Sequence, residues 1–393
     1  MTVSKPGDIE DFALKRFLND RAGPRVRYNL SSSVCEPLTV DDLLALEDGA
    51  ARGLAQLSLG YPGLHGSASL RALIAGRYAG LGADDILVTT GADDAIALLL
   101  LSSVAPGDHV VVHAPGYQPF AALARWRGCA VSPWSAREEA GWALDLDELV
   151  GLLTPRTRLI VVIMPHNPTG YLMPEPTFAD LLCLTEERGI TVVSDEIYAG
   201  VAADPAAELS PAASLSPRAV SLGGLSKSFG LPGLRVGWIA TADRALLDRA
   251  RRVRMHANSF ASAPSEYLAA IALRHSAAIL ARNRAIARDN LAAVAAFIDG
   301  HRDLLAWRAP RAGVLAFPRL LGPETADQFC AAVLAGAGIL LAPSPLFGYG
   351  DRHIRIGFGL KNVPAALAAL DRYPLVPLVH ERLADSARRH GDE

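Results

Sequence analysis

The sequence predicts an α/β protein in which helices flank a mostly parallel central sheet and a smaller α+β domain follows at the carboxyl end. Three observations support this fold class. The 393 residues exceed what one small core needs and suit two domains. Short β-branched runs alternate with Ala/Leu-rich segments of helical length through the middle of the chain. Beyond residue 297 this alternation changes to a mixed order of strands and helices.

Five apolar runs predict the strands of the central sheet. They are ILVTT from Ile86, HVVVH from His109, LIVVIM from Leu159, ITVVSD from Ile190 and AVSL from Ala219. Continuous β-branched runs of this length are typical of strands buried on both faces, as in a parallel sheet. Helices are expected between them at residues 93–104, 119–127, 175–188 and 243–253, which makes repeated βαβ units the economical topology.

The rest of the chain predicts a second, smaller unit. We expect one long helix over residues 264–297, strands at GVLAFPRL and HIRIGFG, and helices at 326–335 and 365–372. The Pro/Ala-rich stretch 202–217 is expected to be a surface loop. These elements give an amino-terminal arm of residues 1–40 that joins the small domain, a large α/β domain of residues 41–285, and a small domain of residues 286–393.

Composition excludes several classes of partner. The formal net charge is −3, so no nucleic acid or acidic membrane surface is expected. Neither a signal peptide nor an apolar run long enough to cross a bilayer is expected. Four scattered cysteines show no metal-ligand spacing, so we expect no metal, free thiols and a cytoplasmic location.

Polar residues follow each predicted strand at its carboxyl end, where open α/β sheets bind ligands. Gly91, Ala92 and Asp93 follow the first strand and open a helix, a geometry that favours phosphate, although Asp93 is also a plausible helix cap. Tyr117 follows the second strand and could stack on a flat ring or belong to the core. Asn167 follows the third, in a segment that could be a simple Asn-Pro turn.

The fourth strand ends at Asp195, with Tyr198 three residues later. A carboxylate at the end of an apolar strand is costly to bury without a positive partner. The fifth strand leads into SLGGLSKSFGLPGLRVGW, a glycine-rich stretch that carries Lys227 and Arg235. The chain has only four lysines, and Lys227 is the sole one in its middle part.

A lysine in such a loop has two possible roles. It could be an ion-pair partner, for example of Asp195, or it could form a Schiff base with an aldehyde, because partial desolvation lowers the pKa of its amine. Pyridoxal 5′-phosphate needs a lysine for its aldehyde, an acid for its ring nitrogen, an aromatic ring, donors to its phenolic oxygen and an anion cradle. One such site accounts for all of these residues.

These motifs resemble those of fold type I pyridoxal-phosphate enzymes, in the class I and II aminotransferase family. Seven segments carry the resemblance, in order from Tyr61 to Arg355: GYPGLHGSASLR, TTGADDAI, APGYQPF, PHNPTG, SDEIY, SKSFGLPGLRVGW and HIRIGF. The resemblance implies an enzyme that acts on an amino acid, a homodimer, and bound pyridoxal phosphate.

The resemblance also implies a role for each residue. Lys227 would bind the cofactor and move the proton at Cα, while Asp195 would keep the ring nitrogen protonated. Tyr198 and Asn167 would hold the phenolic oxygen, and Tyr117 would stack on the ring. Arg355 would bind the substrate carboxylate as a bidentate fork. The phosphate would be held by Gly91, Ala92, Asp93, Ser226 and Arg235, with Tyr61 reaching in from the partner subunit.

Two positions depart from the family pattern. Gly224 stands where many members have a serine that donates to the phosphate, and Cys35 stands where the substrate loop has a glycine, which makes Cys35 a candidate substrate-binding residue. The serine run before Cys35 resembles capreomycidine synthase and its relatives, which eliminate and add at a side-chain carbon. Transamination of an L-α-amino acid is the first expectation, and such replacement, in an arginine derivative or S-adenosylmethionine, is the alternative.

Two further classes are less well supported by the sequence. A cofactor-binding transcriptional regulator needs a DNA-binding module before the domain, and residues 1–40 contain no helix-turn-helix or basic cluster. A nucleotide-binding protein would carry GxGxxG in the first βα turn, where this chain has GADDAI.

Overall fold

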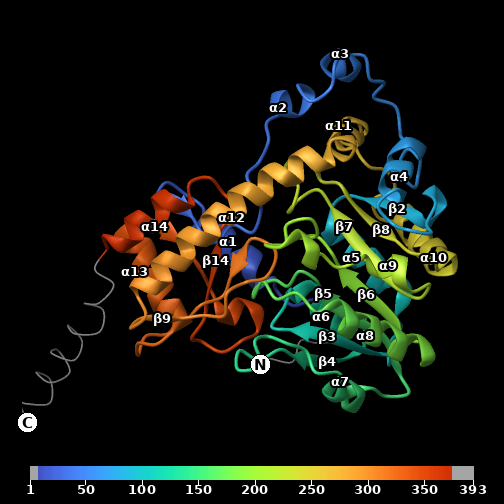
Figure 1. Ribbon diagram of the computed structural model, residues 1–393. Coiled ribbons are helices and arrows are strands. Elements are labelled where there is room, and N and C mark those ends of the chain that lie inside the picture. The colour runs from blue at the N-terminus through green and yellow to red at the C-terminus, as the bar shows by residue number, and fades with distance from the viewer. Residues whose placement is uncertain (1–7, 374–393) are drawn as a thin grey trace, which may run out of the picture.

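The computed structural model describes residues 8–373. A large α/β domain and a smaller domain lie side by side, and the long helix α12 (Ser276–Gly300) runs along both of them (Figure 1). This arrangement agrees with the predicted fold class. The amino-terminal arm begins with α1 (Ala13–Arg21) and continues to β1 (Tyr28–Asn29), which pairs in parallel with β12 (Ile339–Leu340) of the small domain.

The large domain is built on one seven-stranded sheet in the order β2-β8-β7-β6-β5-β3-β4. Every neighbouring pair is parallel except those of β8, which is antiparallel to both β2 and β7. The strands are β2 (Ile86–Thr89), β3 (His109–Ala114), β4 (Ala130–Ser135), β5 (Thr157–Ile163), β6 (Thr191–Asp195), β7 (Val220–Gly224) and β8 (Gly237–Ala240). The sequence predicted five of these strands and missed β4 and β8.

Helices cover both faces of this sheet. Val110 and Val112 of β3 pack in one apolar cluster with residues of α5 (Ala92–Ser103), α6 (Gln118–Trp126) and α10 (Arg244–Met255). Val111 of the same strand lies in a second cluster with residues of α7 (Leu146–Leu152) and α8 (Glu175–Glu187). Successive side chains of a strand point to opposite faces, which is why one valine run serves two cores.

The small domain has a core of its own. Helices α12, α13 (Ala326–Ala337) and α14 (Val363–Asp371) surround short strands, of which β10, β14 and β13 form one sheet. The strand bounds are β9 (Leu305–Ala306), β10 (Leu315–Ala316), β11 (Arg319–Leu320), β13 (Ala342–Pro343) and β14 (Ile354–Gly357). Helix α12 continues through residue 285, where the sequence had placed the domain boundary.

Two sequence predictions about helices were wrong. The expected single helix over 264–297 is two helices, α11 (Ala263–Arg274) and α12, because His275 leaves the helical conformation with φ −103° and ψ 22°. The expected loop 202–217 contains the short helix α9 (Ala212–Leu215), whose Ala212 and Ala213 are buried against the sheet. Small apolar residues at that position are therefore core residues.

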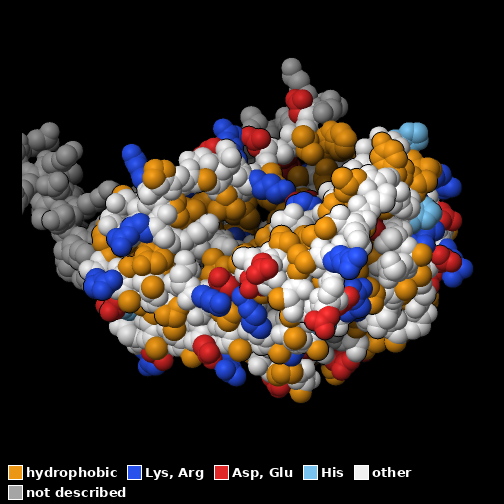
Figure 2. Space-filling model, turned by 90° about the horizontal axis from the view of Figure 1, so that it is seen from above, with side chains coloured by type: hydrophobic (Ala, Val, Ile, Leu, Met, Phe, Trp, Pro, Cys, Tyr) orange, Lys and Arg blue, Asp and Glu red, His pale blue; other side chains and the backbone are white. Residues whose placement is uncertain are grey.

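The remaining short helices connect the arm to the large domain and close individual turns. They are α2 (Val40–Leu44), α3 (Ala50–Ala55) and α4 (Ala68–Ala75), with 3₁₀ turns η1 (Ala83–Asp85), η2 (Pro205–Ala207), η3 (Pro232–Leu234) and η4 (Ser344–Phe347). Seen from the side on which α2, α3 and α11 lie, the surface carries groups of hydrophobic side chains and is hollowed near its middle (Figure 2). No helix within residues 8–373 is both long and apolar enough to cross a membrane.

Candidate active site

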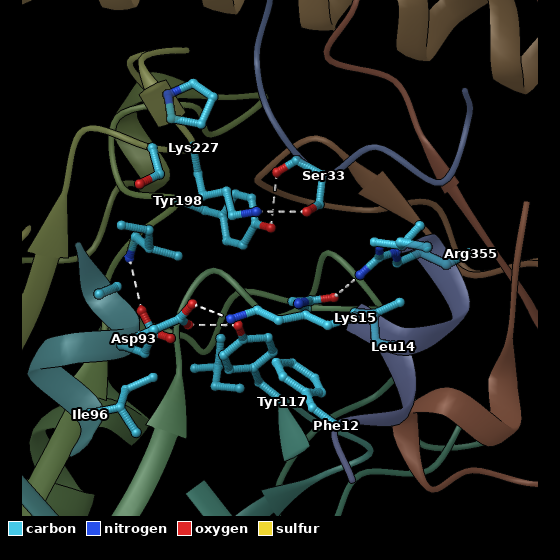
Figure 3. Close-up of a pocket in the computed structure, with 18 of the residues that line it drawn as sticks. Phe12, Leu14, Lys15, Ser33, Asp93, Ile96, Tyr117, Tyr198, Lys227 and Arg355 are labelled. Carbon is cyan, nitrogen blue, oxygen red and sulfur yellow. Dashed lines mark hydrogen bonds and ion pairs between the residues drawn. The ribbon is translucent and has the colours of Figure 1, made fainter. Parts of the chain in front are cut away.

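A cavity of about 400 Å³ lies at the carboxyl ends of the central strands, between the two domains and α1 (Figure 3). It brings together ten of the residues singled out in the sequence: Ala92, Asp93, Tyr117, Asn167, Asp195, Tyr198, Ser226, Lys227, Arg235 and Arg355. Most of these residues converge because parallel strands end at the same edge of the sheet, whereas Arg355 comes from β14 of the small domain. No group of three or more His, Cys, Asp or Glu able to hold a metal occurs in the described part of the chain.

Lys227 follows β7 and extends toward the amino-terminal arm. Its Nζ donates a hydrogen bond of 2.7 Å to Oγ of Ser33. Burial of the ammonium group lowers the pKa of Lys227 to about 8, and the nearby positive charge of Arg355 adds to this effect. About one-tenth of the amine is therefore neutral, and so nucleophilic, at pH 7, far more than for an exposed lysine.

Asp195 closes β6 and is buried beneath the cavity. Its Oδ1 accepts a hydrogen bond of 3.2 Å from the backbone N–H of Ile197. Burial raises the pKa of Asp195 to about 7, against the lowering effect of that hydrogen bond. Asp195 forms no ion pair with any residue that the structure describes, and the charge of Lys227 lowers its pKa less than burial raises it.

The amino terminus of α5 forms an anion cradle with Arg235. Gly91 has φ 87°, and a Cβ on it would lie 2.5 Å from Nη2 of Arg235, so only glycine allows the guanidinium to approach this turn. Arg235 itself adopts the left-handed conformation with φ 53°. Free backbone N–H groups at a helix start and an adjacent guanidinium together suit a phosphate group.

Asp93 and Tyr117 are linked beside this cradle. The hydroxyl of Tyr117 donates to Oδ1 of Asp93 at 2.7 Å, and Nζ of Lys15 lies 2.6 Å from Oδ2. Burial alone would raise the pKa of Asp93, but the hydrogen bonds from Lys15 and Tyr117 outweigh it and lower the pKa. Asp93 is therefore ionised at neutral pH.

Arg355 is a buried guanidinium without a carboxylate partner among the described residues. Its Nη1 donates to Oδ1 of Asn167 at 2.9 Å and its Nη2 to the carbonyl of Ser31 at 2.7 Å, while Nε has no partner there. The guanidinium lies 4.7 Å above the ring of Phe347. Burial lowers the pKa of Arg355 to about 10, which still leaves it charged at neutral pH. Its location suits a small anionic ligand such as an amino-acid carboxylate.

Tyr198 completes this side of the cavity. Its hydroxyl donates to the carbonyl of Ser33 at 3.1 Å, and burial raises the pKa of Tyr198 to about 12.

Three of the site residues predicted from the sequence do not line the cavity. Gly91 precedes the lining residue Ala92, whereas Tyr61 and Cys35 lie away from the cavity of this chain.

Cys35 belongs to the small-domain core. It is fully buried, and burial raises the pKa of its thiol to about 12. Only its backbone faces the lysine loop, through a hydrogen bond of 3.1 Å from its N–H to the carbonyl of Lys227. The structure therefore gives its side chain no access to a substrate.

Gly224 is tightly packed where many family members carry a serine. A Cβ there would lie 2.8 Å from Cδ1 of Ile197 and 3.2 Å from the carbonyl of Val236. Ile197 occupies the space that a serine side chain would need, so its packing accounts for the glycine.

The residues of the amino-terminal arm that line the cavity were not predicted from the sequence, which offered Cys35 instead. Ser33 contacts Lys227 directly, and Phe12, Leu14, Lys15 and Leu18 of the arm line the wall opposite the sheet. The serine run was visible in the sequence, but nothing in it showed which hydroxyl points inward. The apolar spacing of Leu14 and Leu18 is that of an ordinary amphipathic helix, and only the fold places this helix over the cavity.

Comparison with known proteins identifies the family. The family model for aminotransferase class I and II matches residues 28–369. The chain belongs to this family. The resemblance found in the seven motifs is thereby confirmed, and the family's cofactor is pyridoxal phosphate, as the solved neighbours below also indicate.

Individual family members resemble this chain over most of its length. Capreomycidine synthase of Streptomyces vinaceus is 33% identical over 352 residues, covering 89% of this chain and 88% of the relative. A PLP-dependent aminotransferase from Streptococcus suis superposes with a TM-score of 0.89 at 27% identity, covering 95% of this chain and 99% of the other. The PLP-dependent cyclase OrfR superposes with a TM-score of 0.85 at 31% identity, covering 96% and 99%.

Proposed function

We propose that the protein is a pyridoxal-phosphate enzyme that removes the Cα proton of an L-α-amino acid. The observation that carries this proposal is one cavity holding a lysine of lowered pKa, a buried carboxylate and a buried guanidinium, neither of which has an oppositely charged partner among the described residues. Bound pyridoxal phosphate supplies an electron-accepting ring for the pair of electrons left at Cα. Each unpaired group in the cavity matches one part of this cofactor or of an amino acid.

The side chains of the cavity divide this task. Lys227 would hold the cofactor through its amine and, once the substrate amine has displaced it, would take the proton from Cα as a free neutral amine. Asp195 would face the ring nitrogen of the bound cofactor and keep that nitrogen protonated. Arg355 binds the substrate carboxylate, with Asn167 fixing the plane of the guanidinium.

The other residues of the cavity hold the cofactor in place. Tyr117 would lie against its ring, and Tyr198 and Asn167 would donate to its phenolic oxygen, for which the Tyr198 hydroxyl would exchange its hydrogen bond with Ser33. The phosphate would lie in the anion cradle of Gly91, Ala92, Asp93, Ser226 and Arg235, to which Asp93 would contribute its backbone N–H at the start of α5. Helix α1 covers the opening with apolar side chains, which excludes water from the reacting atoms.

Transamination to a 2-oxo acid is the reaction we propose first. The family as a whole and the Streptococcus suis neighbour support it. A second candidate is elimination and replacement at a side-chain carbon, and the comparisons favour it specifically. Capreomycidine synthase and the cyclase OrfR are both more than 30% identical to this chain over about nine-tenths of its length. Both reactions begin with the same proton transfer by Lys227.

The two reactions are separated by their products. The purified enzyme is mixed with a panel of amino acids that includes arginine derivatives and S-adenosylmethionine, and the products are analysed by mass. Transamination yields a 2-oxo acid and converts the cofactor to its amine form, which added oxo acid reverses. A product that keeps its α-nitrogen and has lost a side-chain leaving group would establish replacement instead. If the enzyme converts no amino acid of the panel, both proposed reactions are contradicted.

We also propose a homodimer in which Tyr61 reaches the phosphate site of the partner. Tyr61 is 86% exposed and stacks on Phe260 with a centroid distance of 4.6 Å, and Leu59 beside it is 81% exposed. Apolar side chains this exposed on one loop suit contact with a second copy of the chain. Sedimentation at micromolar concentration tests the assembly, and a fully active monomer would contradict it. The four cysteines of the chain are free thiols, which suits a location in the reducing cytoplasm.

A further inference from the structure

A carboxylate lies in the proposed anion site. Asp93 belongs to the first turn of α5, next to Gly91 and Ala92, and it lines the same cavity as Arg235. Its contacts keep it ionised at neutral pH. A phosphate dianion in the cradle would be repelled by this charge, since like charges at short range in a partly buried site interact strongly.

A cation from another part of the chain meets this carboxylate. Lys15 extends from α1 across the cavity, and its Nζ lies 2.6 Å from Oδ2 of Asp93 (Figure 3). The Lys15 side chain is 59% exposed and that of Asp93 is 38% exposed. Ion pairs this exposed add little to folding stability, so stability alone does not explain the contact.

Contacts other than Lys15 hold α1 in this place. The N–H of Ala13 donates to Oε1 of Gln118 at 3.0 Å, and Nε2 of Gln118 donates to the carbonyl of Asp11 at 2.8 Å. Arg125 and Glu10 form an ion pair of 2.9 Å. The arm therefore remains docked on α6 when the charge of Lys15 is removed, and a Lys15 variant tests charge rather than docking.

The rest of the cradle offers little to offset the charge of Asp93. A serine at position 224 is excluded by Ile197, so that neutral donor is missing. Arg235 provides one guanidinium, and the start of α5 provides only partial positive charge. The balance of full charges next to the phosphate therefore depends on Lys15.

We propose that Lys15 is a positioning residue of the cofactor site, which neutralises Asp93 and so allows the phosphate group to bind. This inference rests on the proposed function, because it assumes that the cradle at α5 takes the phosphate of pyridoxal phosphate. It assigns to the amino-terminal arm a role in cofactor affinity within its own subunit.

The test uses the full-length chain freed of cofactor, in five forms: wild type, Lys15→Met, Lys15→Arg, Asp93→Asn and the double variant Lys15→Met with Asp93→Asn. Dissociation constants are measured by absorbance titration for pyridoxal phosphate and for pyridoxal, which lacks the phosphate. The Lys15→Met variant should bind pyridoxal phosphate about tenfold more weakly than the wild type, which corresponds to about 1.4 kcal/mol. It should bind pyridoxal with the same affinity as the wild type. Asp93→Asn should bind pyridoxal phosphate at least as tightly as the wild type.

The double variant decides between charge compensation and a structural role. If Lys15 acts by neutralising Asp93, removal of both charges restores the affinity for pyridoxal phosphate to within about threefold of wild type. The Lys15→Arg variant keeps the positive charge and should therefore retain the affinity for pyridoxal phosphate. A double variant as weak as Lys15→Met, or equal losses for pyridoxal and pyridoxal phosphate, would overturn the inference. A wild-type chain that binds neither compound would refute the proposed function itself.

Discussion

Replacement of Asp195 by asparagine removes one negative charge from the cavity and keeps the size of the side chain. Burial raises the pKa of Asp195 from 3.8 to about 7, so the folded chain without cofactor binds this proton more tightly than the unfolded chain. Each pH unit between these pKa values corresponds to about 1.4 kcal/mol, which gives about 4 kcal/mol as the cost of burying the ionised group. This penalty is absent below pH 3.8, grows with pH and is complete above about pH 7.

The cofactor-free Asp195→Asn variant should therefore be more stable than the wild type at pH 8, by about 2–4 kcal/mol, and equally stable near pH 4. Its turnover with cofactor should fall at least ~10³-fold, because an amide cannot hold the proton of the ring nitrogen, a loss of about 4 kcal/mol of transition-state stabilisation. Denaturant unfolding at the two pH values and steady-state kinetics measure these effects.

The neighbouring acid provides a matched control. Glu196 is partly buried, and desolvation raises its pKa to about 7, but it accepts hydrogen bonds from Ser221 and Ala212 and does not line the active-site cavity. Glu196→Gln should keep turnover within about tenfold of wild type. An Asp195→Asn enzyme within tenfold of wild type, or one less stable than wild type at pH 8, would refute the reasoning about Asp195.

Packing and exposure give three further expectations. Gly224→Ser should destabilise the fold by about 1–3 kcal/mol, since its Cβ would overlap Ile197, and an unchanged melting temperature for this variant would contradict that packing. A thiol reagent should react only with Cys183 in the native protein, because the other three cysteines are buried. Rapid reaction of Cys35 would contradict the burial of its side chain. Tyr61→Ala should weaken cofactor binding about tenfold without loss of folding stability, and unchanged affinity would remove Tyr61 from the partner's site.

Most of the fold could be predicted because most strands of the central sheet are apolar runs. The two missed strands lack that signal for physical reasons. Strand β4 lies at the edge of the sheet, carries Pro133 and is only partly buried, which an edge strand tolerates. Strand β8 is short and begins at Gly237, where a Cβ would lie 2.6 Å from Gly91. The close approach requires a glycine at this position, and in the sequence that glycine cannot be told from those of the preceding loop.

The cavity residues that lie at the ends of strands could be predicted from the sequence, and those from the amino-terminal arm could not. Asp195, Asn167 and Lys227 follow strands, so topology alone brings them together. Lys15 and Ser33 come from the arm, whose position is set by tertiary contacts with α6 and the small domain. Side-chain direction within the arm depends on these contacts, and no local pattern encodes it.

The most direct test of the account is to locate the cofactor on the chain. The holoenzyme is reduced with borohydride, digested, and its peptides are mapped by mass. Lys227 has a lowered pKa and lies in the same cavity as Asp195, so the pyridoxyl group should be found on Lys227, and Lys227→Ala should carry none. Lys15 lines the same cavity and is the nearest competing amine among the described residues. A pyridoxyl group on Lys15, or on no lysine at all, would contradict the proposed active site.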